Sequence, residues 1–164
     1  MIVVSNTSPL TNLAAIGQFE VLHRLYARLY IAPTVWEELN AGGERWPGRD
    51  EVVIADWIES HLVQNQALVT ALRRDLDHGE AESITLALEL KADLVLLDEK
   101  EGRHAAQRLG LQVVGTVGIL LEAKARGLIE TIRPHLDALR QVAGFYLASS
   151  VYQHALTLAN EGGD

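Results

Sequence analysis

The stretch VVSNTSPL, Val3–Leu10, changes from apolar to polar within a few residues and decides how the chain begins to fold. The β-branched run from Ile2 to Ser5 is typical of a strand buried on both faces. Ser8 is a favoured N-cap residue and Pro9 suits a first helical turn, so a helix is expected directly afterwards. Asn6 therefore lies at the carboxyl end of a buried strand, where α/β proteins often place chemistry.

The same strand-to-helix pattern recurs along the chain. Leu29–Ala32 reads as a strand followed by a helix at Pro33, and Leu94–Leu97 reads as a strand that ends on Asp98. A short strand is expected near 61–63 and another over 111–114, the latter turning into a helix at Gly115-Thr116. Strands that alternate with helices predict an α/β fold, with a parallel sheet flanked by helices in three α/β/α layers.

The length of 164 residues suits one domain with a sizeable core. We expect a single domain over 1–160 and a frayed tail over 161–164, because the last residues are EGGD. The stretch 41–49, AGGERWPGR, is rich in Gly and predicts an exposed loop.

Composition narrows the classes of protein. The net charge of −8 argues against a basic nucleic-acid coat, although an acidic nuclease can attract phosphate through a bound cation. The absence of Cys excludes a disulfide scaffold and a thiolate zinc site. No signal peptide or membrane-spanning run is visible, so we expect a cytoplasmic protein without a membrane partner.

Acidic and amide side chains are placed at strand ends and helix starts. Asp98 directly follows four aliphatic residues, which favours a functional role over turn capping. Glu80 and Glu82 begin a helix, where acids also favour the helix dipole. Glu38, on the helix after the second strand, would alone be a solvated acid, and Asn6 alone would be a capping residue. Together, oxygen ligands of this kind suit Mg²⁺ or Mn²⁺, which can activate water and neutralise a phosphodiester.

Five blocks in this order, covering nearly the whole chain, resemble the PIN-domain family: VVSNTSPL, APTVWEEL, GEAESITLAL, LVLLDEKEGR and VVGTVGILL. The blocks are most similar to a prokaryotic branch related to VapC-type toxins. The resemblance implies a Rossmann-like α/β/α fold and a ribonuclease dependent on Mg²⁺ or Mn²⁺. It also implies an RNA substrate, a toxin silenced by a cognate antitoxin protein, and a homodimer.

The resemblance also assigns residues. The family's second acid falls on Glu38, its third on Glu80 or Glu82, and its fourth on Asp98. The catalytic set is then Asn6, Glu38, Glu80, Glu82 and Asp98, of which Asn6, Glu38, Glu82 and Asp98 would hold the metal. Supporting positions fall on Thr7, Ser8, Arg103 and Thr116.

Asn6 departs from the family, which usually has Asp at this position. An amide keeps an oxygen ligand but removes one negative charge, so weakened cation binding and reduced activity are expected. A catalytically silent PIN-fold module that binds RNA or protein is therefore an alternative to the nuclease. A phosphatase with Asp98 as nucleophile is a third reading, but the chain lacks its supporting Lys and second Asp.

Overall fold

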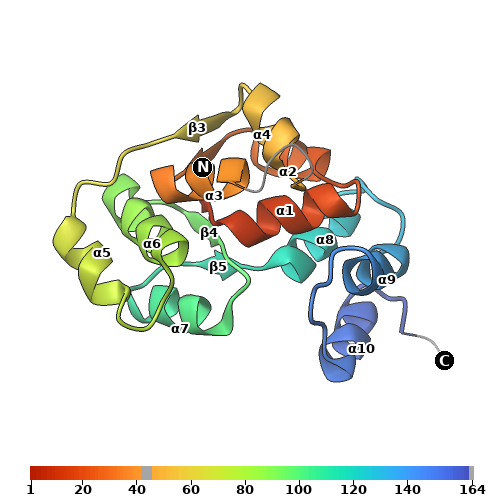
Figure 1. Ribbon diagram of the computed structural model, residues 1–164. Coiled ribbons are helices and arrows are strands. Elements are labelled where there is room, and N and C mark those ends of the chain that lie inside the picture. The colour runs from red at the N-terminus through yellow and green to blue at the C-terminus, as the bar shows by residue number, and fades with distance from the viewer. Residues whose placement is uncertain (42–45, 163–164) are drawn as a thin grey trace.

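The computed structural model describes residues 1–41 and 46–162. Among these, five short strands form one parallel sheet in the order β3-β2-β1-β4-β5. The strands are β1 (Val3–Ser5), β2 (Leu29–Ile31), β3 (Ile58–Ser60), β4 (Leu94–Leu96) and β5 (Val113–Val114). The predicted α/β/α parallel sheet is confirmed (Figure 1).

Helices connect and cover the strands. Their bounds are α1 (Thr7–Ala15), α2 (Glu20–Tyr26), α3 (Pro33–Ala41), α4 (Arg49–Ile54), α5 (Gln66–Leu72), α6 (His78–Leu90), α7 (Lys100–Arg108), α8 (Thr116–Ala125), α9 (Arg133–Gln141) and α10 (Ser149–Leu158). Within the described residues, no helix is both long and apolar enough to cross a membrane.

The side chains of β1 point alternately to the two faces of the sheet, and each face has its own hydrophobic cluster. Val3 joins one cluster, with side chains from α1, α2, α8, α9 and α10. Its neighbour Val4 joins the other, with side chains from α5, α6 and α7. Successive strand residues point to opposite faces, so a strand covered on both sides must be apolar throughout.

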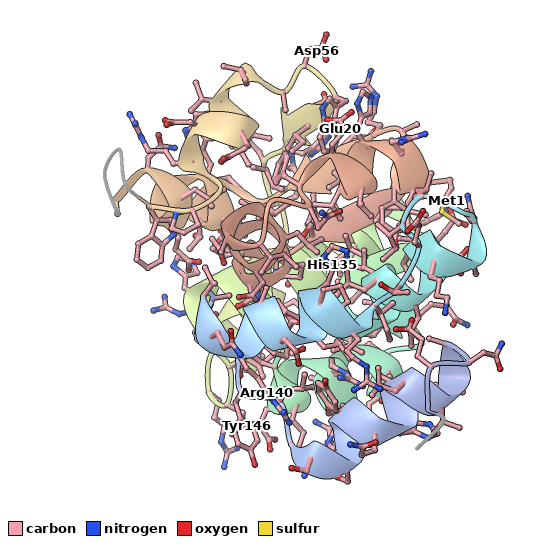
Figure 2. All side chains as sticks on the ribbon, turned by 90° about the vertical axis from the view of Figure 1, so that its right-hand side faces the viewer. Met1, Glu20, Asp56, His135, Arg140 and Tyr146 are labelled. Carbon is pink, nitrogen blue, oxygen red and sulfur yellow. The ribbon has the colours of Figure 1, made fainter. Side chains whose placement is uncertain are left out.

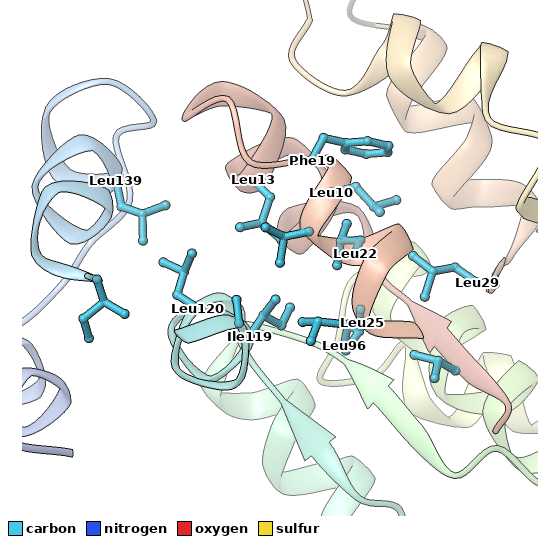
Figure 3. Close-up of a cluster of buried hydrophobic side chains, with 14 of the residues drawn as sticks. Leu10, Leu13, Phe19, Leu22, Leu25, Leu29, Leu96, Ile119, Leu120 and Leu139 are labelled. Atoms are coloured by element: carbon cyan, nitrogen blue, oxygen red, sulfur yellow. The ribbon is translucent and has the colours of Figure 1, made fainter. Parts of the chain in front are cut away.

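The larger of the two clusters is dominated by leucine. Leu10, Leu13, Leu22 and Leu120 are all fully buried, and Figure 3 shows them between α1, α2 and α8. Replacing any one of them with alanine is expected to cost about 2–5 kcal/mol of unfolding free energy.

The α9–α10 pair, which faces the viewer in Figure 2, extends this core. Arg140 links its two helices: its Nη2 and Nε donate to the Leu147 carbonyl at 2.7 and 3.1 Å. Its guanidinium carbon also lies 4.4 Å from the centre of the Tyr152 ring, whose hydroxyl donates to Asp137.

Four local expectations are corrected by the structure. The strand expected near 61–63 is β3 at Ile58–Ser60. The first helix begins at Thr7 with Asn6 as its N-cap, two residues earlier than a Ser8 cap requires. The loop expected over 41–49 ends earlier, because α4 begins at Arg49, and its residues 42–45 lie outside the described part of the chain.

The fourth correction concerns the tail. Glu161, expected to be frayed, pairs with Lys124 at 3.0 Å and accepts hydrogen bonds from the backbone N–H groups of Ile132 and Arg133. These bonds lower the pKa of its carboxyl, although burial alone would raise it. The chain is therefore anchored as far as Glu161, whereas residues 163–164 lie outside the described range.

Candidate functional site

The carboxyl ends of β1, β4 and β5 bring Asn6, Asp98 and Thr116 to one edge of the sheet. β1 pairs with β4 in the register Ser5↔Leu96, and the Asn6 N–H donates to the Leu96 carbonyl at 2.9 Å. The chain order runs from β1 to β2 and β3 on one side, then returns to β4 and β5 on the other. This reversal beside β1 creates the crevice in which parallel sheets bind ligands.

Asn6 is buried in this crevice with an unused acceptor. Its side chain is 4% exposed, and its Oδ1 has no hydrogen-bond partner among the described residues. A buried acceptor without a partner costs about 1–3 kcal/mol, so such an atom calls for a ligand. A cation or a water would satisfy it.

Asp98 is held in place by three donors. The Thr116 N–H donates to its Oδ1 at 2.7 Å, while Thr116 Oγ1 and Asn12 Nδ2 donate to its Oδ2 at 2.8 and 3.2 Å. Burial raises the pKa of the Asp98 carboxyl, and these bonds together with the positive charge of Arg103 only partly oppose the rise. The carboxylate is thus oriented but incompletely compensated for its loss of water.

Glu38 lies against the start of α6. The Thr7 hydroxyl donates to its Oε2. A Cβ added to Gly79, in the first turn of α6, would lie only 2.7 Å from Glu38 Oε1. The absence of a side chain at Gly79 therefore gives the Glu38 carboxylate its place beside the positive end of the α6 dipole.

This close approach makes Gly79→Ala a specific probe of Glu38. Alanine favours a helix over glycine by up to about 1 kcal/mol, and the clashing carboxylate is the end of a flexible side chain, so the fold should survive. We expect Tm to stay within about 4 °C of the parent value, whereas the RNA cleavage that the sequence resemblance implies should fall about tenfold. Thermal unfolding and a cleavage assay on the same preparation measure both.

A double-mutant cycle provides the control. If Gly79→Ala acts by displacing Glu38, it should weaken Mn²⁺ binding by the parent chain and weaken it no further in Glu38→Gln. Additive losses would show that Gly79 acts by another route.

Glu80 belongs to the helix cap as well as to the crevice. Asp77 Oδ1 accepts from the Glu80 N–H at 2.8 Å, and Glu80 Oε2 accepts from the Asp77 N–H at 3.1 Å, which completes a capping box. Burial raises the pKa of Glu80 to about 7, helped by the charges of Asp77, Glu99 and Glu38. Burial is thus the main cause of the raised pKa of Glu80, and Glu38 is the one predicted site acid whose charge contributes to it.

The raised pKa predicts how stability depends on pH in the metal-free protein. The folded state retains the Glu80 proton up to a pKa of about 7, whereas the unfolded chain releases it near 4.5. The contribution of Glu80 to the unfolding free energy is then greatest below pH 4.5 and declines as pH rises to 7, by up to about 3 kcal/mol. Denaturant unfolding of the parent chain and Glu80→Gln between pH 4 and 8 tests this, since the decline should be steeper in the parent than in the variant, which still contains Asp98. Parallel curves for the two proteins would contradict the prediction.

The buried carboxylate of Glu82 is bonded to the first turn of α3. Its carboxylate is 6% exposed, its Oε1 accepts from the Thr34 N–H at 2.9 Å, and His78 Nε2 lies 3.7 Å from its Oε2. It thereby caps the first turn of α3, which gives this buried acid a structural task. Its predicted role as a metal ligand stays a prediction.

The acids do not form the compact cluster expected from the sequence. Among the described residues, no group of three or more His, Asp or Glu side chains is placed to hold a metal ion. Asn6 contributes an amide and not a carboxylate, and different protein donors hold Glu38, Glu80 and Glu82.

Three of the four predicted supporting residues act on an acid of the site. Thr7 and Thr116 each bond an acid, and Arg103 lowers the pKa of Asp98 through its charge. The backbone carbonyl of Ser8 accepts a hydrogen bond from the Thr11 hydroxyl. The sequence reasoning missed Asn12, which no motif marks, and Asp77, which the Asp-x-x-Glu capping pattern could have revealed.

The donor set nevertheless suits a hard divalent cation. It consists of carboxylate and amide oxygens without sulfur, and it includes the partnerless Oδ1 of Asn6. Two of its carboxyls, Glu80 and Asp98, have pKa values that burial raises.

Comparison with known proteins agrees with this geometry. A protein-family model described as a PIN domain matches residues 2–161, which is nearly the entire chain. A search of curated proteins found no match.

Proposed function

The chain belongs to the PIN-domain family, whose fold is that of nucleases, and from this premise we propose that it is a divalent-metal-dependent endoribonuclease. PIN domains generally depend on a divalent metal and bind nucleic acid. The proposal that the metal is Mg²⁺ or Mn²⁺ and the substrate RNA goes beyond family membership. It rests on the all-oxygen donor set and on the likeness of the sequence blocks.

We assign the cation to Asn6, Glu38, Glu80 and Asp98. Glu80 takes the place given to Glu82 by the sequence, because Glu82 caps α3 and Glu80 senses the charge of Glu38. A bound cation would supply activation of water and neutralisation of charge on the phosphodiester. Asn6 offers a neutral oxygen where the family usually has a charge, so we expect weak cation affinity.

The remaining groups orient and balance charge. Thr116 holds both oxygens of Asp98, and Thr7 holds Glu38. The positive charge of Arg103 lowers the pKa of Asp98. Its guanidinium is also suited to bind a phosphate oxygen of the substrate. The Glu80 carboxyl, with its pKa of about 7, holds a proton that it must release when the cation binds.

One observation carries this proposal. The buried, partnerless Oδ1 of Asn6 lies at the reversal point of the sheet, one residue past the strand that pairs with the strand leading to Asp98. A purely structural asparagine at this position would be expected to use its acceptor.

Cleavage of a 5′-labelled single-stranded RNA tests the function. We expect slow cutting in Mn²⁺, none in chelator, and none by Glu38→Gln in either condition. Cutting that persists in chelator, or that Glu38→Gln retains, would contradict the proposed site.

Asn6 itself supports a second candidate, a silent PIN-fold module that binds RNA or protein without cutting. The same assay separates the two, because a silent module binds RNA while leaving it intact even at millimolar Mn²⁺. The toxin role, the cognate antitoxin and the homodimer are also proposals, supported by likeness to the VapC-related branch. An antitoxin would complement the acids with a basic segment.

A further inference from the structure

A groove of about 680 Å³ runs from Asp98 along α7 to the segment that precedes α10. It is also lined by β5, by the first turn of α8, by the segment 145–148 and by Val151 of α10. Because Asp98 lines one end, the groove is continuous with the proposed catalytic crevice. We refer to it as the α7 groove.

Basic and polar side chains of α7 line this groove at helical spacing. Lys100, Arg103, His104 and Gln107 recur every three or four residues and therefore share one face of the helix. Among the described residues that line it, Asp98 is the one acid, although the whole chain carries a net charge of −8. Glu99, the N-cap of α7, and Glu101, in its first turn, do not line the groove. A local positive face on an acidic protein suits a polyanion.

The lining of the α7 groove also includes an exposed aromatic ring, that of Tyr146. Tyr146 is 89% exposed, the most exposed of the large apolar side chains in the described part of the chain. In Figure 2 it lies at the periphery of the molecule, near Arg140.

The backbone that carries Tyr146 is fixed on both sides. The Phe145 N–H donates to the Leu139 carbonyl at 2.9 Å, and Arg140 holds the Leu147 carbonyl. Leu147 itself is buried in the core. An exposed ring on a backbone held in this way offers a surface on which a base can stack.

We propose that the α7 groove binds single-stranded RNA next to the cleaved bond, with phosphates on Lys100 and Arg103 and one unpaired base stacked on Tyr146. This deepens the proposed function and rests on it. Phosphate contacts would fix the position of the strand, and stacking would require that the base be unpaired. Base pairing in a duplex prevents this contact, so the groove selects for single strands.

RNA binding without chemistry tests the groove. Fluorescence anisotropy in chelator, with a labelled single-stranded octanucleotide, measures affinity independently of cutting. We expect Tyr146→Ala to weaken binding about tenfold and Tyr146→Phe to retain it, because stacking needs the ring and not the hydroxyl. Replacing bases with abasic spacers should remove the difference between the parent chain and Tyr146→Ala.

Salt dependence tests the phosphate contacts. Lys100→Ala should reduce the slope of log affinity against log salt by about 0.7, the value for one phosphate contact on a single strand. Arg24→Ala, at an exposed position on α2 outside the groove, is the matched control and should leave the slope unchanged.

The outcomes separate the two proposals. If RNA is cut in Mn²⁺ but Tyr146→Ala and Lys100→Ala bind like the parent, the α7 groove assignment is wrong and the nuclease stands. If both changes weaken binding as expected but RNA is never cut, the groove is correct and the silent module is favoured. Binding of an acidic peptide that displaces no RNA, with RNA affinity unchanged in both variants, would assign the groove to a protein partner instead.

Discussion

Asp98→Asn is expected to abolish RNA cleavage while leaving the fold intact. The substitution removes the negative charge that three donors orient at the strand end, and we expect the rate to fall by at least about 100-fold. Burial raises the pKa of Asp98, which means that the folded state disfavours its charge. Removing that charge at pH 7 should therefore change Tm by less than about 5 °C.

Single-turnover cleavage with Mn²⁺ and thermal unfolding measure the two quantities. Asp56→Asn, an identical change at an exposed position before β3, serves as the control and should retain full activity. Loss of folding in Asp98→Asn, or activity equal to that of the control, would contradict the assignment.

Asn6→Asp is expected to have the second large effect. It should lower Tm in chelator, and Mn²⁺ should restore Tm and raise cleavage. Without a cation it introduces a charge at a buried position whose Oδ1 has no hydrogen-bond partner among the described residues. An uncompensated buried charge costs roughly 3 kcal/mol, so Tm in chelator should fall by about 10 °C.

With Mn²⁺ the same charge becomes a ligand. We expect Mn²⁺ to restore the Tm of Asn6→Asp, to shift the parent far less, and to raise cleavage by the variant about tenfold or more. Asn65→Asp, at the exposed N-cap of α5 where either residue suits, is the matched control. An Asn6→Asp protein whose Tm does not respond to Mn²⁺ would show that no cation binds at this strand end.

Much of this architecture could be predicted from the sequence because its cause is local. The apolar runs at β1, β2 and β4 must be buried on both faces, and a polar residue or Pro ends each one. The position of β3 was misjudged since its exposed Glu59 and Ser60 weaken the apolar signal, whereas the flanking Leu62 and Val63 strengthen a false one.

The site was less predictable because side-chain direction depends on distant partners. Sequence spacing allows either Glu80 or Glu82 to face the other acids. In the folded chain Glu82 accepts from the Thr34 N–H, 48 residues away, and Glu80 forms a capping box with Asp77. Asn12 reaches Asp98 across 86 residues, a contact that only the folded chain creates.

The most direct test of the central claim is a titration of the protein with Mn²⁺, followed by the electron paramagnetic resonance signal of the free ion. We expect the parent chain to bind Mn²⁺ weakly, Asn6→Asp to bind it at least about tenfold more tightly, and Asp98→Asn to lose binding. Equal binding by all three proteins, or binding by none, would contradict a cation site at the ends of β1 and β4.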